Sequence, residues 1–237
     1  MEAQDAKQTA MEIIRRKVLT MELEPGQPID EVKLARELGL SRTPLREIVQ
    51  RLSGEGYLTL EKNRGAKVSS MDIATLGEFF QAAPMIYAAI SQLAAERATQ
   101  THISELKEIQ VKFRRSLTDG DRREIALHNN AFHRAIGRIA NSPYLIASLD
   151  RLLIDHARIS LTFYNPSSQD VIERIETAAD QHDQMIQAFE RHLPDEAVSI
   201  TLEHWNLSRD SIERFVRPDP IPFELGEHEL KRSGNEV

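Results

Sequence analysis

Three histidines stand at positions where each would point into the interior of a helical bundle. His133, His182 and His204 each interrupt a regular apolar stripe in a different predicted helix, and Asn129 lies one turn before His133 on the same stripe. Imidazoles gathered in an apolar interior repel one another or stay unsatisfied unless a cation organises them. The pattern therefore indicates a divalent transition metal such as Zn, Ni or Mn. The competing interpretation is that each histidine is a hydrogen-bonded core residue, which is the commoner role of a single one.

A second group of residues suits contact with DNA. Ser41, Arg42, Thr43 and Arg46 stand at the start of a predicted helix, and the two arginines, four residues apart, project from one face. The first turns of a recognition helix lie in the major groove, where arginine can bind a guanine edge or a phosphate. The further candidates are Arg51 and, in a predicted hairpin turn, Lys62, Arg64 and Gly65. The alternative is that the arginines form an ordinary solvated helix face.

Charge and composition narrow the possible classes of protein. Residues 1–70 carry 12 basic and 11 acidic residues, although the whole chain has 30 against 37 and a net charge of −7. The positive charge is local, so an acidic chain does not exclude DNA binding. The absence of cysteine excludes disulfides, thiolate nucleophiles and Cys-ligated zinc. With no signal peptide and no apolar run of about 20 residues, we expect a cytoplasmic protein without a membrane partner.

The elements that must position these residues are mainly α-helical. Residues 1–70 predict a winged helix-turn-helix, with Asp30 and Ser41 capping its second and third helices and Val32 on the apolar side of the second. Residues 71–217 predict an antiparallel six-helix bundle in which Pro84 should kink or split the first helix. Residues 218–237, rich in proline, are expected to form a flexible tail. The expected helices are 7–22, 31–38, 42–53, 72–98, 102–118, 121–140, 143–164, 168–192 and 195–216, and the expected strands are 57–60 and 66–68.

The N-terminal segment resembles a known family of DNA-binding domains. Its string LARELGLSRTPLRE over 34–47, preceded by Pro25-Gly26 and followed by Glu55-Gly56-Tyr57 and RGAKV over 64–68, is similar to the head of GntR-family bacterial regulators. The resemblance implies that Arg42, Thr43 and Arg46 contact operator bases or phosphates. It also implies that Arg51 and the wing support them.

The helical segment resembles the effector domain of the FadR-type branch of that family. The resemblance rests on NNAFHRAI over 129–136, Gln181-His182-Asp183 and Leu202-Glu203-His204, and six helices are similar to the VanR-like subgroup. It implies a metal held by an acidic residue and three histidines, with a small carboxylate effector completing the coordination. Asn129 stands where Asp is commoner, which keeps an oxygen ligand but removes a charge.

The resemblance also identifies a departure in the effector cavity. The arginine that often holds a ligand carboxylate in the family, and a glutamate one turn on, would fall near Ala83 and Tyr87, so the carboxylate clamp is missing at its usual position. We expect Tyr87, Arg134, His156 and Arg158 to be candidates for the cavity, because His156 is in phase with an inward stripe and the arginines could replace the missing cation. For His156 the alternative is a core hydrogen bond, and for the arginines a solvated position.

Taken together, these patterns predict a transcriptional regulator rather than an enzyme. We expect a homodimeric repressor that binds a palindromic double-stranded operator and responds to a small organic acid at a metal-containing site. One alternative is a metal-free regulator whose histidines bind the ligand directly or are structural. A second is a metal-dependent hydrolase, which is disfavoured because no carboxylate is clearly placed as a general base.

Overall fold

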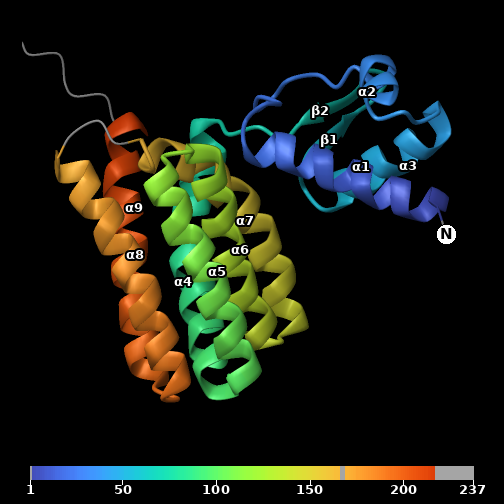
Figure 1. Ribbon diagram of the computed structural model, residues 1–237. Coiled ribbons are helices and arrows are strands. Elements are labelled where there is room, and N and C mark those ends of the chain that lie inside the picture. The colour runs from blue at the N-terminus through green and yellow to red at the C-terminus, as the bar shows by residue number, and fades with distance from the viewer. Residues whose placement is uncertain (1, 166–168, 217–237) are drawn as a thin grey trace, which may run out of the picture.

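Helices form two lobes in the computed structural model, which describes residues 2–165 and 169–216. Figure 1 shows a small head lying beside one end of a long helical bundle, next to α7. The head contains α1 (Glu2–Leu19), α2 (Glu31–Glu37), α3 (Arg42–Gly54), β1 (Leu58–Glu61) and β2 (Gly65–Val68). The bundle contains α4 (Ile73–Arg97), α5 (Gln100–Asp119), α6 (Arg122–Ala140), α7 (Pro143–Phe163), α8 (Gln169–Glu190) and α9 (Pro194–Val216). The predicted tail over 218–237 lies outside the described residues.

The expected winged helix-turn-helix is confirmed, with local differences. Asp30 caps α2 by accepting hydrogen bonds from the backbone N–H groups of Val32 and Lys33. Ser41 is the N-cap residue of α3, as predicted, but its side chain makes no capping hydrogen bond. Val32 is 51% exposed rather than packed inward, because α2 is only two turns long and turns a narrow face to the core.

The wing is an antiparallel hairpin whose register runs from Leu58 opposite Val68 to Glu61 opposite Gly65. Its turn needs two residues in the left-handed region, Asn63 at φ 63° and Gly65 at φ 81°. Asparagine and glycine adopt that conformation at the lowest cost, which explains why the basic turn closes here. The turn is held by the Arg64 N–H, which donates to the Glu61 carbonyl at 3.1 Å.

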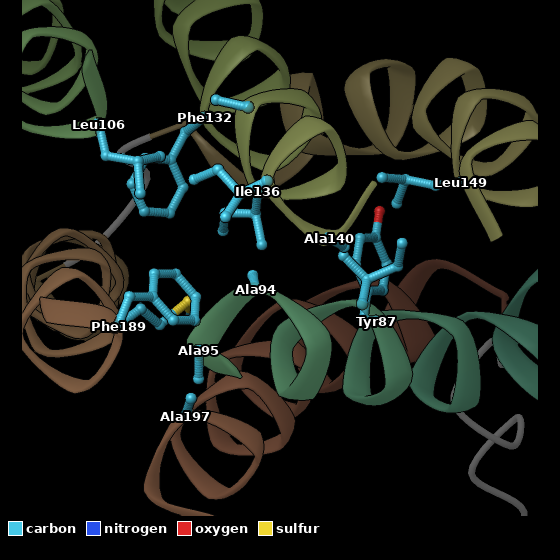
Figure 2. Close-up of a cluster of buried hydrophobic side chains, with 14 of the residues drawn as sticks. Tyr87, Ala94, Ala95, Leu106, Phe132, Ile136, Ala140, Leu149, Phe189 and Ala197 are labelled. Atoms are coloured by element: carbon cyan, nitrogen blue, oxygen red, sulfur yellow. The ribbon is translucent and has the colours of Figure 1, made fainter. Parts of the chain in front are cut away.

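The bundle encloses one large apolar core. Figure 2 shows side chains from all six of its described helices meeting there, including Tyr87 and Ala94 of α4 and Phe132 of α6. By length and composition alone α4 could cross a membrane, but it packs against α6, α7, α8 and α9. Pro84 lies inside α4, and the helix runs unbroken through it, so the predicted split does not occur.

Helix α7 belongs to both lobes. Ile154 and Ala157 are buried in the core of the head together with Leu45, Leu52 and other residues of α1 and α3. One turn away, Leu149 and Leu153 are buried in the core of the bundle. The two lobes are therefore joined by a shared helix and not only by the linker over 69–72.

Polar contacts reinforce this junction. The fully buried Arg158 donates from Nη1 to the Ser69 carbonyl at 2.7 Å and pairs through Nη2 with Asp155. Asp155 also accepts from Arg151 Nη1 at 2.8 Å. The stem of Arg151 lies against Gly56 of the head, where an added Cβ would come within 2.6 Å of Arg151 Cδ.

Gly56→Ala is expected to lower the free energy of unfolding by about 1–2 kcal/mol. Alanine would have to adopt a φ of 89° and displace Arg151, and both changes oppose folding. Urea denaturation checks this, with Gly54→Ala as the matched control because nothing lies within 4 Å of the added methyl group there. Equal unfolding free energies for the two variants would contradict the analysis.

Candidate metal centre and nucleic-acid interface

The three predicted histidines meet in the interior of the bundle. His133 on α6, His182 on α8 and His204 on α9 are all buried, and their potential ligand atoms lie within 4.8 Å of one another. Among the described residues, the Nε2 atoms of His133 and His182 are buried without a hydrogen-bond partner. Three neighbouring imidazoles are a donor set that suits a divalent transition metal, so these residues fit such an ion.

Asn129 lies one turn before His133 on α6 and is also buried. Its Oδ1 accepts a hydrogen bond from the Tyr164 hydroxyl at 3.1 Å. An amide oxygen has two lone pairs, so Oδ1 keeps one for a further contact. Tyr164 is thus placed to orient Asn129 relative to the histidine cluster.

Neighbouring rings fix the imidazoles from several sides. The His182 ring stacks on Phe132, with centroids 4.0 Å apart and an interplanar angle of 19°. His133 and His204 have ring centroids 5.4 Å apart, and His182 and His204 are 4.7 Å apart. Because all three imidazoles are buried, the site is shielded from water and strongly disfavours extra protons.

A small cavity adjoins the histidines. It is lined by Tyr87, His133, His156, Thr201, His204 and Trp205 and has a volume of about 10 Å³. The Tyr87 hydroxyl and His156 Nδ1 are 2.6 Å apart, which joins α4 to α7 across this space. Since the volume holds about one water molecule, an organic ligand would require the lining side chains to move.

Burial lowers the pKa of every imidazole in this group. Desolvation is the main cause, and it holds the pKa values of His133 and His182 well below 6.5. The pKa of His156 falls to about 4 and that of His204 to about 3. The four rings are therefore neutral near pH 7, and neutral imidazole is the form that ligates a metal.

The predicted DNA-contacting residues are exposed on the head. Ser41, Arg42, Thr43 and Arg46 lie at the start of α3, while Arg51 lies further along the same helix. The turn residues of the wing, Lys62, Arg64 and Gly65, are exposed as well. None of these residues contributes to the buried core of the head, so they are accessible to a polyanion, and Arg51 pairs with Glu55 at 3.2 Å.

Glu31, at the start of α2, links the recognition helix to the wing. Its Oε2 lies 3.6 Å from Arg46 Nε, and its Oε1 lies 4.0 Å from the position of a Cβ built on Gly65. Glu31 therefore lies close to both of the predicted DNA-contacting elements, and its ion pair with Arg46 is exposed.

Comparisons with known proteins show the family to which this chain belongs. Residues 6–68 match the family described as bacterial regulatory proteins, gntR family, and residues 78–207 match the FCD domain, more than half of the chain. The chain belongs to the GntR family, with an FCD domain as its helical part. This family consists of transcriptional regulators and not enzymes, so the hydrolase alternative is set aside.

The individual relatives agree with that membership. The chain is 38% identical over 84 residues to the Nta operon transcriptional regulator of Aminobacter aminovorans, a match covering 35% of this chain and 40% of that protein. It is 27% identical over 182 residues, 76% of each chain, to the "Probable D-xylose utilization operon transcriptional repressor" of Paenarthrobacter nicotinovorans. The solved structure of E. coli McbR/YncC has a TM-score of 0.75 at 20% identity and covers 90% of this chain and 99% of that one, which shows a shared fold.

Of the four residues predicted for the effector cavity, two line the cavity and two lie elsewhere. Tyr87 and His156 line the space beside the histidines. Arg134 instead donates from Nη2 to the Tyr57 hydroxyl of the head at 3.3 Å, and Arg158 holds the Ser69 carbonyl. The two arginines are therefore placed at the junction with the head and not at the cavity, because each follows an inward residue by one or two positions and so projects from another side of its helix.

Four residues near the histidines were not predicted from the sequence. Gln110 of α5 contacts His182, and Gln181 of α8 contacts His204. Thr201 and Trp205 of α9 line the cavity. Gln110 interrupts the apolar stripe formed by Ile103, Leu106 and Phe113, which is the signal that could have revealed it. Thr201 precedes His204 by three residues and so shares its face.

The free energy of unfolding of the metal-free protein is expected to fall as the pH is lowered from about 6.5 toward 4. Unfolded histidines take up protons near pH 6.5, whereas the buried ones stay neutral to much lower pH, so acid favours the unfolded state. The stabilisation is complete above pH 6.5, and each group contributes up to about 1.4 kcal/mol per pH unit. Urea denaturation with chelator at pH 7.5 and pH 5.0 measures it. His204→Gln should show a smaller loss, and an equal loss in this variant would contradict the assignment.

Proposed function

We propose that this regulator is a repressor that binds a palindromic operator as a homodimer and is controlled by a divalent transition metal together with a small organic acid. The observation that carries the proposal is the buried cluster of His133, His182 and His204, because His133 lies on α6, which also contacts the DNA-binding head. The protein would act in the cytoplasm, where the chromosome lies. Repression is supported by the relatives whose names describe repressors.

The head supports sequence-specific binding. Arg42 and Arg46 are exposed near the N-terminus of α3, where a guanidinium can take a guanine edge or a phosphate. Lys62 and Arg64 at the tip of the wing supply further positive charge for the DNA backbone. A homodimer would present two such heads, one for each half of a palindrome.

The histidine cluster supports metal binding. His133, His182 and His204 would hold the ion through ring nitrogens, and Asn129 can supply an oxygen. A bound metal would provide positive charge for an anionic ligand. None of the residues that line the adjoining cavity is an arginine or lysine, so the charge that a carboxylate needs would come from the ion.

Helices α6 and α7 support communication between the two sites. On α6, His133 faces the cluster and its neighbour Arg134 contacts Tyr57 of the head. On α7, His156 contacts Tyr87 at the cavity and its neighbours Asp155 and Ala157 belong to the junction and to the core of the head. A ligand that rotates or shifts either helix would therefore alter the position of the head, provided that it binds one arrangement more tightly than the other.

Arg46→Ala is expected to weaken operator binding by about tenfold or more, since a bidentate arginine–guanine contact contributes about 1–3 kcal/mol. The operator would be obtained by selection from a random-sequence duplex library, and affinity measured by fluorescence anisotropy at fixed salt. Arg115→Ala is the control, because Arg115 is exposed on α5 of the bundle and carries the same charge. Unchanged affinity in Arg46→Ala would refute the assignment of the recognition helix.

Native protein purified without chelator or an affinity tag is expected to contain close to one equivalent of transition metal, and His133→Ala should lose it. Removing one of three imidazole ligands weakens the chelate, while the rest of the bundle stays packed. Elemental analysis of both proteins measures the content, and circular dichroism confirms folding. A native protein that takes up no Zn, Ni or Mn would leave the metal-free regulator, in which the histidines contact the ligand directly.

A further inference from the structure

The side chain of Gln110 has only one possible orientation. It is buried on α5, and its Nε2 donates to the carbonyl of Ala179 on α8 at 2.8 Å. A backbone carbonyl can only accept hydrogen bonds, so the amide nitrogen must face it. The amide oxygen, Oε1, consequently points the other way, toward His182.

That orientation determines which nitrogen of His182 carries the proton. Oε1 of Gln110 lies 3.1 Å from His182 Nδ1, and an amide oxygen can only accept. Nδ1 must therefore be the protonated nitrogen of the neutral ring. The lone pair is left on Nε2, which is buried without a hydrogen-bond partner among the described residues.

A second glutamine lies beside a second histidine of the cluster. Oε1 of Gln181 lies 3.2 Å from Nδ1 of His204, and both residues are buried. Gln181 adjoins His182 in sequence, so one turn of α8 supplies a histidine to the cluster and the hydrogen-bond partner of another. The two contacts together link α5, α8 and α9 around the site.

We propose that Gln110 is a positioning residue that holds His182 in the Nδ1–H tautomer, so that its Nε2 faces a divalent transition metal, and that Gln181 orients the ring of His204. This inference rests on the metal site proposed above, but the tautomer itself is a property of the metal-free protein. The partner of the non-ligating nitrogen commonly fixes a metal-binding imidazole, and its loss weakens metal affinity by about 10–100-fold. The glutamines act through the histidines and touch no ligand themselves.

The first test is nitrogen NMR of the metal-free protein with ¹⁵N-labelled histidine at pH 7.5. The expected result is a protonated Nδ1 and an unprotonated Nε2 for His182, whose signals are identified by their absence in His182→Gln. Gln110→Met keeps the length of the side chain but removes its acceptor, and it should shift His182 toward the Nε2–H tautomer. An Nε2–H tautomer in the wild-type protein would overturn the proposal.

The second test is Zn²⁺ affinity, measured by competition with a chromophoric chelator. Gln110→Met should bind Zn²⁺ about 10–100-fold more weakly than the wild type, whereas Gln110→Glu, which keeps an oxygen acceptor for Nδ1–H, should recover most of the affinity. Gln92→Met is the matched control because Gln92 is exposed on α4. Co²⁺ spectra of the same proteins report the ligand geometry, which a purely structural role of Gln110 would not change.

The outcomes separate this inference from the proposed function. If the wild type binds Zn²⁺ and Gln110→Met binds it equally well, the positioning role is refuted and the metal site stands. If the wild type binds no Zn²⁺, the metal site fails, and a positioning role toward a metal fails with it. In that case the NMR result still decides whether Gln110 fixes the tautomer of His182.

Discussion

Burying four imidazoles inside a bundle of helices imposes the constraint on which the rest of the structure depends. A buried imidazole is costly without a hydrogen-bond partner, and for three of the four rings a neighbouring helix supplies one. Gln110 of α5 serves His182, Gln181 of α8 serves His204, and Tyr87 of α4 serves His156. These contacts set the relative rotation of the helices more narrowly than apolar packing would, because a hydrogen bond tolerates little change in distance or angle.

Burial of these rings also leaves some imidazole nitrogens available to bind a cation. Partners occupy one nitrogen of His182 and one of His204, while Nε2 atoms of His133 and His182 have none. In an ordinary core such unpaired nitrogens would only lower the free energy of unfolding. The potential ligand atoms of His133, His182 and His204 lie within 4.8 Å of one another, so a divalent cation bound there would link the stability of this lobe to its occupancy.

Much of the fold could be predicted from the sequence because helix phase and turn residues are local signals. The stripes containing His133, His182 and His204 were enough to place three imidazoles together. Phase alone distinguishes inward from outward positions, but it does not say which neighbour lies on each side. Arg134 and Arg158 were therefore assigned to the cavity, although their helices turn them toward the head. Gln110 was not predicted because its partners, Ala179 and His182, are on α8 and are brought beside it only by the packing of that helix.

The sharing of α7 also bears on how this kind of protein can evolve. Ile154 and Ala157 complete the core of the head, and the stem of Arg151 lies against Gly56, so the head and the bundle have complementary surfaces. Recombination that joined this head at residue 70 to the helical domain of a distant relative would leave a cavity where Ile154 now packs and an unmatched contact at Gly56. A head can therefore be exchanged between such regulators only when the α7 helix of the recipient carries side chains that fit the head. The junction constrains which recombinants can fold, in addition to the constraint that the DNA-contacting residues impose.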